Sequence, residues 1–226
     1  METSLHRQLK ALYVADEAQH EVVLGDYRID AVRGKELIEV QHGSLAAIRD
    51  KIRRLLEDHR VRVVKPIVAR KTLVKLPEPG AEPISRRRSP KRGTLLDVFD
   101  ELVYFTRVFP HPRLVLEVVL VEIEELRYPG RGKRRRRRRP GEEFQIEDQR
   151  LVGVDSHHQF RRASDLMKLL PSRLPRPFHT GHLAERMDVP RGIAQRIAYC
   201  LREMGAVEEA GKAGNAILYQ RKRRAA

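Results

Sequence analysis

Cysteine and long apolar runs are scarce in this chain of 226 residues, and acidic residues are fewer than basic ones. The single cysteine, Cys200, excludes an intramolecular disulfide and any zinc site built from cysteines. No stretch approaches the roughly 18 consecutive apolar residues of a membrane span, and the first residues lack the apolar region of a signal peptide. We therefore expect a cytoplasmic protein with no membrane partner.

Because basic residues outnumber acidic ones, the chain is strongly basic. It has 46 lysine and arginine residues against 31 aspartate and glutamate residues, which gives a formal net charge of +15. A charge of this sign and size favours a polyanionic partner, with nucleic acid as the first candidate. The alternative is a basic protein whose charge only aids solubility. Because 41% of the residues are hydrophobic, the chain can still bury the core of one large or two small domains.

Residues 1–75 alternate between helical and extended patterns. Leu5, Leu9 and Leu12 recur at helical spacing and predict a first helix, with Ser4 as its N-cap. Three strand-like runs, a second amphipathic helix and a strand rich in β-branched residues then follow in order. Their expected ranges are 20–25, 27–32, 36–41, 45–59 and 61–75. The two short gaps between the first three strands predict consecutive hairpins.

Composition divides the rest of the chain into three further parts. Residues 76–93 have the Pro, Gly, Ser and Arg content of a basic linker. Residues 94–165 predict a helix, capped by Thr94 and Asp97, and a long β-hairpin with an arginine-rich tip. This tip is either a phosphate-contacting arm or a solvated loop. Its candidate DNA-binding residues are Arg134, Arg135 and Arg136.

The last part, residues 166–226, contains two helical segments followed by two strands. Over residues 178–221 this order resembles the winged helix-turn-helix superfamily. The resemblance implies that the unit holds duplex DNA, although some winged helices contact proteins instead. On the longer helix, the residues expected to face the core are Ile193, Ile197, Leu201 and Met204. The candidate DNA-binding residues are Arg191, Gln195, Arg196, Arg202, Lys212 and Arg221.

Two carboxylates, Asp30 and Glu39, lie on neighbouring strands of the second predicted hairpin. Alternation along the second of these strands places Glu39 and Gln41 on one face of the sheet. Two close carboxylates repel each other, so they are tolerable mainly when a cation lies between them. Oxygen ligands suit Mg²⁺, which activates water and offsets negative charge on a phosphate under attack.

The pattern is Asp30, eight intervening residues, then Glu39-Val40-Gln41, within the order helix, three strands, helix, strand. It resembles the PD-(D/E)XK nuclease superfamily, which includes restriction endonucleases and archaeal Holliday-junction resolvases. The resemblance implies a Mg²⁺-dependent phosphodiester hydrolase with Asp30 and Glu39 as metal ligands and Mn²⁺ as an alternative ion. A first-helix glutamate often completes such sites. Glu2 matches that location best, and Glu17 and Glu21 are weaker matches.

The motif departs from the family at Gln41, where lysine is usual, and a glutamine cannot supply positive charge to the attacked phosphate. Lys51 is the candidate replacement. It is seven residues from Ser44 on the helix after the motif, so it borders the apolar stripe that faces the sheet carrying Glu39. The resemblance allows a lysine to migrate to this helix. The alternative is a boundary lysine that reaches into water.

The sequence therefore predicts an α/β fold with a restriction-endonuclease-like α-β-β-β-α-β core, a central basic β-hairpin and a C-terminal winged helix. We expect a metal-dependent DNA endonuclease acting on duplex or branched DNA, with Asp30, Glu39, Gln41 and Lys51 as catalytic candidates. One rival is a non-catalytic DNA-binding protein that keeps the nuclease fold as a scaffold. Another is a basic RNA-binding protein. A homodimer is compatible with each of these readings.

Overall fold

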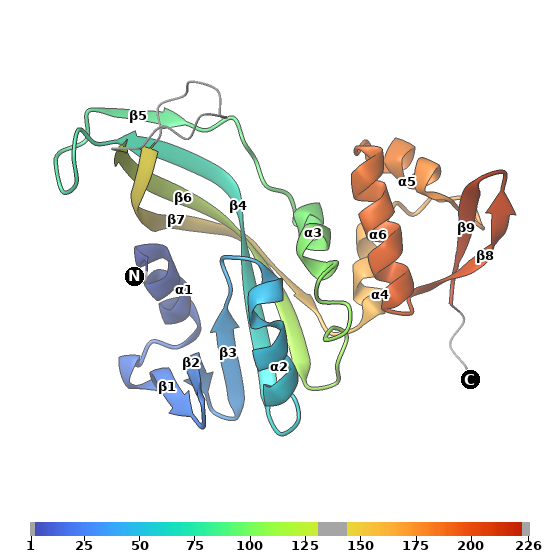
Figure 1. Ribbon diagram of the computed structural model, residues 1–226, viewed down its shortest axis with the longest axis horizontal. Coiled ribbons are helices and arrows are strands. Elements are labelled where there is room, and N and C mark those ends of the chain that lie inside the picture. Colours follow the sequence, from blue (N-terminus) through green and yellow to red (C-terminus); the bar gives the residue numbers. More distant parts are fainter. Residues whose placement is uncertain (1–2, 131–143, 223–226) are drawn as a thin grey trace.

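The computed structural model describes residues 3–130 and 144–222, and these form a mixed α/β fold with several helices around a large sheet (Figure 1). Seven strands make up the main sheet, in the order β1-β2-β3-β4-β6-β7, and β5 pairs with β4 off this path. Two further strands form a separate small sheet near the C-terminus. None of the helices within the described ranges is both long and apolar enough to cross a membrane.

The first part of the chain follows the predicted order of elements. Its helices and strands are α1 (Ser4–Tyr13), a 3₁₀ turn (Glu17–Gln19), β1 (His20–Leu24), β2 (Tyr27–Arg33), β3 (Glu36–Val40), a 3₁₀ turn (Leu45–Ile48), α2 (Arg49–Leu55) and β4 (Arg60–Lys75). Thr3 rather than Ser4 caps α1, because its side chain accepts a hydrogen bond from the backbone N–H of His6. Gly25 and Gly34 take positive φ angles of 57° and 60°, which the two tight hairpin turns require.

The two faces of the main sheet carry separate apolar cores. Leu5 and Leu9 of α1 pack against one face, where they meet Ile38 and Val40 of β3. On the opposite face, side chains of α2 and α3 pack with Leu37 and with residues of β4 and β6. Because adjacent residues of β3 point to opposite faces, this strand contributes to both cores.

The sheet continues past the domain boundary that the sequence predicts at residue 75. The long hairpin of β6 (Leu114–Pro129) and β7 (Phe144–Phe160) is present, and β6 runs parallel to β4 over nearly its full length. The predicted linker 76–93 contains β5 (Ser85–Arg88), which pairs antiparallel with the end of β4. Both segments thus belong to one sheet with residues 1–75.

The following helical segment begins at the predicted residues. Thr94 and Asp97 cap each other's backbone at the start of a 3₁₀ turn (Leu95–Asp97) that leads into α3 (Val98–Leu102). The backbone N–H of Thr94 donates to Asp97 Oδ2 at 3.1 Å. α3 packs on the sheet face that α2 also covers, and its Phe99 and Leu102 are fully buried.

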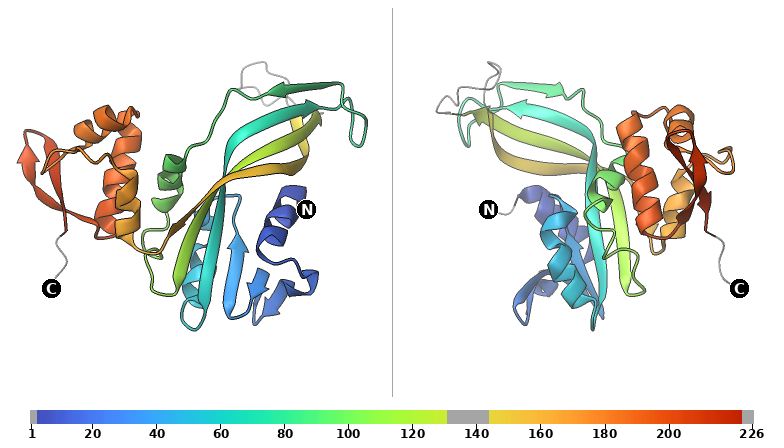
Figure 2. Two further views of the ribbon diagram at one scale, coloured as in Figure 1. Left: turned by 180° about the vertical axis from the view of Figure 1, so that it is seen from behind. Right: turned by 45° about the vertical axis from the view of Figure 1, so that its right-hand side comes forward.

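The C-terminal elements join the rest of the fold where α6 packs against α3, as Figure 2 shows from two sides. They are α4 (Ala163–Leu166), a 3₁₀ turn (Met167–Leu169), α5 (Thr180–Met187), α6 (Arg191–Glu203), β8 (Val207–Ala213) and β9 (Ala216–Arg221). The predicted inward residues of α6 do face the core: Ile197, Leu201 and Met204 are buried, and Ile193 packs against them. The thiol of Cys200 donates to the Phe99 carbonyl at 3.7 Å, so α6 and α3 share one interior.

Candidate active site

Three carboxylates fall in one row across strands β1, β2 and β3. The two hairpin registers place Ala31 opposite His20 on one side and opposite Ile38 on the other. Asp30 is the residue before Ala31, and Glu21 and Glu39 are the residues after His20 and Ile38. In antiparallel strands, Asp30 therefore lies between Glu21 and Glu39. We call Glu21, Asp30 and Glu39 the carboxylate row. Its geometry follows from the two short turns, because turn length fixes which residues of neighbouring strands meet.

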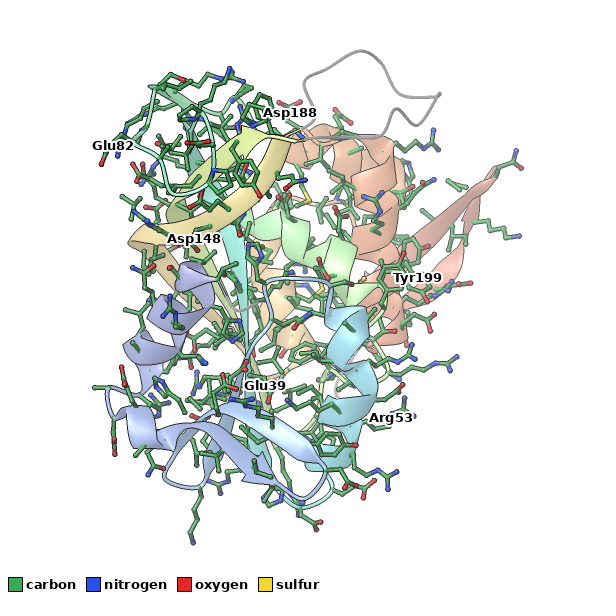
Figure 3. All side chains as sticks on the ribbon, turned by 60° about the vertical axis from the view of Figure 1, so that its left-hand side comes forward. Glu39, Arg53, Glu82, Asp148, Asp188 and Tyr199 are labelled. Atoms are coloured by element: carbon green, nitrogen blue, oxygen red, sulfur yellow. The ribbon has the colours of Figure 1, made fainter. Side chains whose placement is uncertain are left out.

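The side chain of Asp30 contacts β3, the strand that carries Glu39. Asp30 Oδ2 accepts a hydrogen bond of 2.7 Å from the backbone N–H of Val40, the residue after Glu39. The Asp30 side chain remains 18% exposed, whereas that of Glu39 is only 5% exposed. Figure 3 shows Glu39 inside the molecule beside α2, while Arg53 of the same helix lies on its outer side. One carboxylate of the pair is thus open to solvent and the other is enclosed.

Lys51 reaches the carboxylate row from α2. Its Nζ atom lies 2.5 Å from Glu39 Oε1 and also donates to the Arg28 carbonyl at 2.6 Å. The predicted contact between Lys51 and Glu39 is therefore present. The side chain of Lys51 is 20% exposed, so its ammonium group faces both the buried carboxylate and the solvent.

Gln41 lies differently from the expectation. β3 ends at Val40, and the backbone N–H of Gln41 donates to the Val64 carbonyl at 2.8 Å. Its side-chain amide donates to the Ser44 carbonyl at 2.9 Å and closes the loop between β3 and α2. Within the described residues, no hydrogen bond joins Gln41 to Asp30 or Glu39. The geometry supports Gln41 as a loop-forming residue and gives the position beside Glu39 to Lys51.

The pKa values of Asp30 and Glu39 are shifted in opposite directions. Burial and the negative charge of Asp30 raise the pKa of Glu39 to about 7, and the nearby Lys51 ammonium only partly opposes this rise. Burial also raises the pKa of Asp30, but hydrogen bonds from His6 and from the Val40 amide outweigh it, so the net shift is downward. At Glu39, burial and the neighbouring carboxylate thus outweigh the positive charge of Lys51, whereas the charge of Asp30 is compensated. The carboxylate oxygens fit a divalent cation, which would supply positive charge, and the ligand group that the described residues form consists of His6, Glu21 and Asp30 and does not include Glu39.

This electrostatic imbalance makes a stability prediction for the metal-free protein. The pKa of Glu39 is higher in the folded state than the ordinary value of 4.5, so protonation of Glu39 stabilises the folded state. This stabilisation is fully present below pH 4.5 and is lost as the pH rises through about 7. At pH 8, Glu39→Gln should raise the free energy of unfolding by about 1–3 kcal/mol. The gain should vanish near pH 4. Thermal and denaturant unfolding at both pH values measures it, and a variant less stable than wild type at pH 8 would contradict it.

Two further side chains approach Asp30 from the side of α1. His6 Nε2 lies 3.2 Å from Asp30 Oδ1, and one ligand atom from each of His6, Glu21 and Asp30 lies within 4.8 Å of the others. Glu21 has a φ angle of +54°, a left-handed conformation that is uncommon for any residue but glycine and rarer still inside a strand. Backbone strain of this kind costs on the order of 1–3 kcal/mol and is concentrated at functional sites.

Of the predicted first-helix or nearby glutamates, Glu21 is the one that the structure places beside Asp30. It also pairs with Lys10 and, at 2.5 Å, with Arg28. Glu17 lies in the short 3₁₀ turn and is exposed, and Glu2 lies outside the described residues. Sequence reasoning missed His6. Its position one residue after the buried Leu5 was the available signal, because it puts the imidazole at the edge of the helix face that meets the sheet.

The C-terminal unit has a groove between α6 and the β8–β9 hairpin. Three of the predicted DNA-binding residues line it, namely Arg191, Gln195 and Arg202, together with Tyr199 and Asn215. Arg202 is partly neutralised, because it pairs with Glu203 at 3.0 Å and with Glu209 at 2.8 Å. The groove therefore offers one arginine with no acidic partner in the described structure, Arg191, beside an amide side chain.

The remaining predicted DNA-binding residues lie elsewhere. Arg196 pairs with Asp100 of α3 at 2.7 Å, so it joins the helices rather than facing the groove. Lys212 is exposed on β8, and Arg221 lies at the end of β9 beside a second, more apolar pocket near Phe178. Arg134, Arg135 and Arg136 lie outside the described residues. The groove between α6 and the β8–β9 hairpin thus gathers three of the six C-terminal candidates.

Comparison with known proteins shows the family of the chain. Residues 3–161 match the family described as "Domain of unknown function (DUF8091)". The chain is also 31% identical over 222 residues to an "Uncharacterized protein" of Treponema pallidum (strain Nichols), covering 97% of this chain and 85% of that protein. No solved structure matches. The matched family segment spans the whole main sheet with the carboxylate row, and the chain belongs to the DUF8091 family.

Proposed function

We propose that this protein is a metal-dependent DNA endonuclease, with a PD-(D/E)XK-type core formed by α1, β1, β2, β3, α2 and β4. One observation carries the proposal: Lys51 Nζ lies 2.5 Å from Glu39 Oε1, in a site that also contains Asp30. Two carboxylates can hold a metal ion that activates water, and a lysine can stabilise the negative charge that develops on an attacked phosphate. The element order from α1 to β4 supports the same assignment.

Each residue of the site has a distinct role in this proposal. Asp30 and Glu39 would hold the ion, and His6 and Glu21, whose ligand atoms group with that of Asp30, would complete its ligands. A bound Mg²⁺ or Mn²⁺ would polarise the phosphate and lower the pKa of a water molecule. Lys51 partly opposes the rise in the pKa of Glu39 and presents positive charge toward the solvent side, where the attacked phosphate would gain negative charge. Gln41 fixes the β3–α2 loop that positions Lys51.

Cleavage assays on supercoiled plasmid, a four-way junction and single-stranded DNA test the proposal. Each DNA is incubated with the full-length protein and Mg²⁺, Mn²⁺ or EDTA. We expect cutting of at least one DNA with either metal and none with EDTA. Absence of metal-dependent cutting on all three, with DNA binding retained, would instead support a DNA-binding protein that keeps a nuclease fold as a scaffold.

The same proposal assigns the C-terminal unit to DNA binding as a winged helix, supported by the groove between α6 and the β8–β9 hairpin. Arg191→Ala in the full-length protein should lower duplex affinity and reduce the slope of log affinity against log salt by about 0.9. Arg221→Ala removes the same charge outside the groove and should change both quantities much less. Equal losses for the two variants would contradict the assignment of the groove. The full chain is needed, because α6 shares its interior with α3.

A further inference from the structure

A strongly basic pocket lies on the main sheet away from the carboxylate row. It is formed by the second half of β4, by the edge strand β5 and by the segment that follows β5 (Figure 1). We call it the basic pocket. Its lining residues are Arg70, Lys71, Thr72, Arg88, Ser89 and Arg92, with Glu122 at its side. Four cationic and two hydroxyl side chains thus surround one acidic group.

The backbone around the basic pocket is held in place at both ends of the segment after β5. The N–H of Ser89 donates to the Lys71 carbonyl at 2.8 Å, and the N–H of Gly93 donates to the Val68 carbonyl at 2.9 Å. A Cβ atom at Gly93 would lie 2.7 Å from the Val68 carbonyl oxygen and 2.7 Å from Ile67 Cγ2. Because only glycine permits this close approach, the pocket has a fixed backbone rim.

The charges in the basic pocket are unequally satisfied. Arg70 pairs with Glu122 at 2.8 Å and with Asp155 at 2.5 Å, and Lys71 pairs with Glu125 at 2.8 Å. Neither Arg88 nor Arg92 of the basic pocket forms an ion pair with an acidic residue in the ranges 3–130 and 144–222. Two guanidinium groups therefore remain without acidic partners beside cations that are already paired. An anion with several acceptor oxygens would relieve this crowding of positive charge.

We propose that the basic pocket binds a backbone phosphate of duplex DNA through Arg88 and Arg92. Arg86, which pairs with Glu124, lies on the same face of β5 as Arg88 and continues the basic surface along the strand, which suits an extended phosphodiester backbone better than an isolated small anion. This inference rests on the proposed function for the identity of the nucleic acid. Its observations, however, are separate from the carboxylate row.

The distance between the basic pocket and the carboxylate row determines how far from the cut bond this DNA contact lies. Glu39 pairs with Val63 of β4, and Arg70 lies seven residues farther along that strand. At about 3.3 Å per residue, this is at most about 23 Å of strand. A rise of about 3.4 Å per base pair converts it to roughly seven base pairs. The basic pocket thus holds DNA outside the bond to be cut and lengthens the footprint.

Arg87 supplies a matched control for the test. It is an exposed arginine of the same strand, but adjacent residues of a strand point to opposite faces, and it does not line the basic pocket. Full-length Arg88→Ala, Arg92→Ala, Arg87→Ala and Arg88→Lys proteins are titrated with a labelled duplex by fluorescence anisotropy. EDTA is present throughout, so binding is measured without cutting, and several salt concentrations give the salt dependence.

We expect Arg88→Ala and Arg92→Ala each to weaken duplex binding several-fold and to reduce the salt slope by about 0.9, the value for one phosphate contact. Arg87→Ala should bind as wild type, and Arg88→Lys should keep the wild-type slope. Equal losses for Arg87→Ala and Arg88→Ala would overturn the proposal, since they would indicate diffuse attraction. Unchanged binding in both alanine variants of the pocket, or losses with duplex RNA alone, would overturn it as well.

The failure of this inference is distinguishable from failure of the proposed function. If wild-type protein cuts DNA with a metal but Arg88→Ala and Arg92→Ala bind DNA normally, only the pocket proposal fails. If no DNA is cut but both variants lose duplex affinity, the pocket proposal stands and the enzymatic assignment fails.

Discussion

The Asp30→Asn variant is expected to lose metal-dependent DNA cleavage while it keeps the DNA affinity of the wild-type protein. Asp30 is the more exposed of the two central carboxylates and keeps a lowered pKa, so it is ionised at neutral pH and available to a metal ion. A metal ion supplies several kcal/mol of transition-state stabilisation in hydrolysis, which corresponds to a rate loss on the order of a thousandfold when its ligand is removed.

Asp26→Asn is the matched control for this experiment. It makes the same chemical change in the exposed turn between β1 and β2, outside the carboxylate row. Cleavage rates under single-turnover conditions, together with duplex affinity in EDTA, separate the two effects. Normal cutting by Asp30→Asn, or equal losses in both variants, would contradict the assigned role of Asp30.

The second large effect is expected for Lys51→Met, which should reduce the cleavage rate by about two orders of magnitude or more, the scale for loss of one electrostatic stabiliser. The methionine keeps much of the apolar length of the lysine side chain but removes the ammonium group beside Glu39. Since only the carbonyl of Arg28 also loses a donor, folding should be retained. Thermal unfolding is measured alongside the cleavage rate to verify this.

Lys51→Arg and Lys35→Met complete the experiment. The arginine preserves the positive charge and should retain part of the activity, whereas Lys35 lies in the exposed turn between β2 and β3 and its loss should have little effect. Full activity in Lys51→Met would show that the ion pair with Glu39 serves packing alone. Equal losses in Lys35→Met would point to general weakening of DNA attraction instead.

The local part of the fold follows from local patterns in the sequence. Alternating residues and two short turns predict the β1–β2 and β2–β3 hairpins, and their registers then bring Asp30 next to Glu39. Helical spacing likewise predicts that Lys51 borders the face of α2 that packs on the sheet. Each of these features depends on residues that are close along the chain.

Features that depend on distant segments were not predictable in the same way. The residue pattern of β4 predicts a strand but does not indicate that β6 is its parallel neighbour. The boundary expected at residue 75 therefore divides a continuous sheet. β5 has the composition of a linker because it is an exposed edge strand of Ser and Arg residues. The helical pattern predicts Arg196 as a DNA-binding residue, but α6 packs on α3, and Arg196 pairs there with Asp100.

The site shows the same limit. The motif suggests a role for Gln41, but β3 ends one residue earlier and the amide is used to close the loop. His6 comes close to Asp30 only because α1 crosses the sheet at that point, which the helical pattern alone does not determine. The strained φ angle of Glu21 is likewise a property of the assembled strands.

Equilibrium binding of Mn²⁺ to the full-length protein tests the central claim most directly, because it requires no knowledge of the DNA substrate. Electron paramagnetic resonance of free Mn²⁺ during titration measures it for wild type, Asp30→Asn, Glu39→Gln and Asp26→Asn. The account predicts saturable binding by wild type and Asp26→Asn, and its loss or strong weakening in the other two variants. Wild-type protein that binds no Mn²⁺, or that binds it as well after Asp30→Asn, would contradict a metal-dependent site at the carboxylate row.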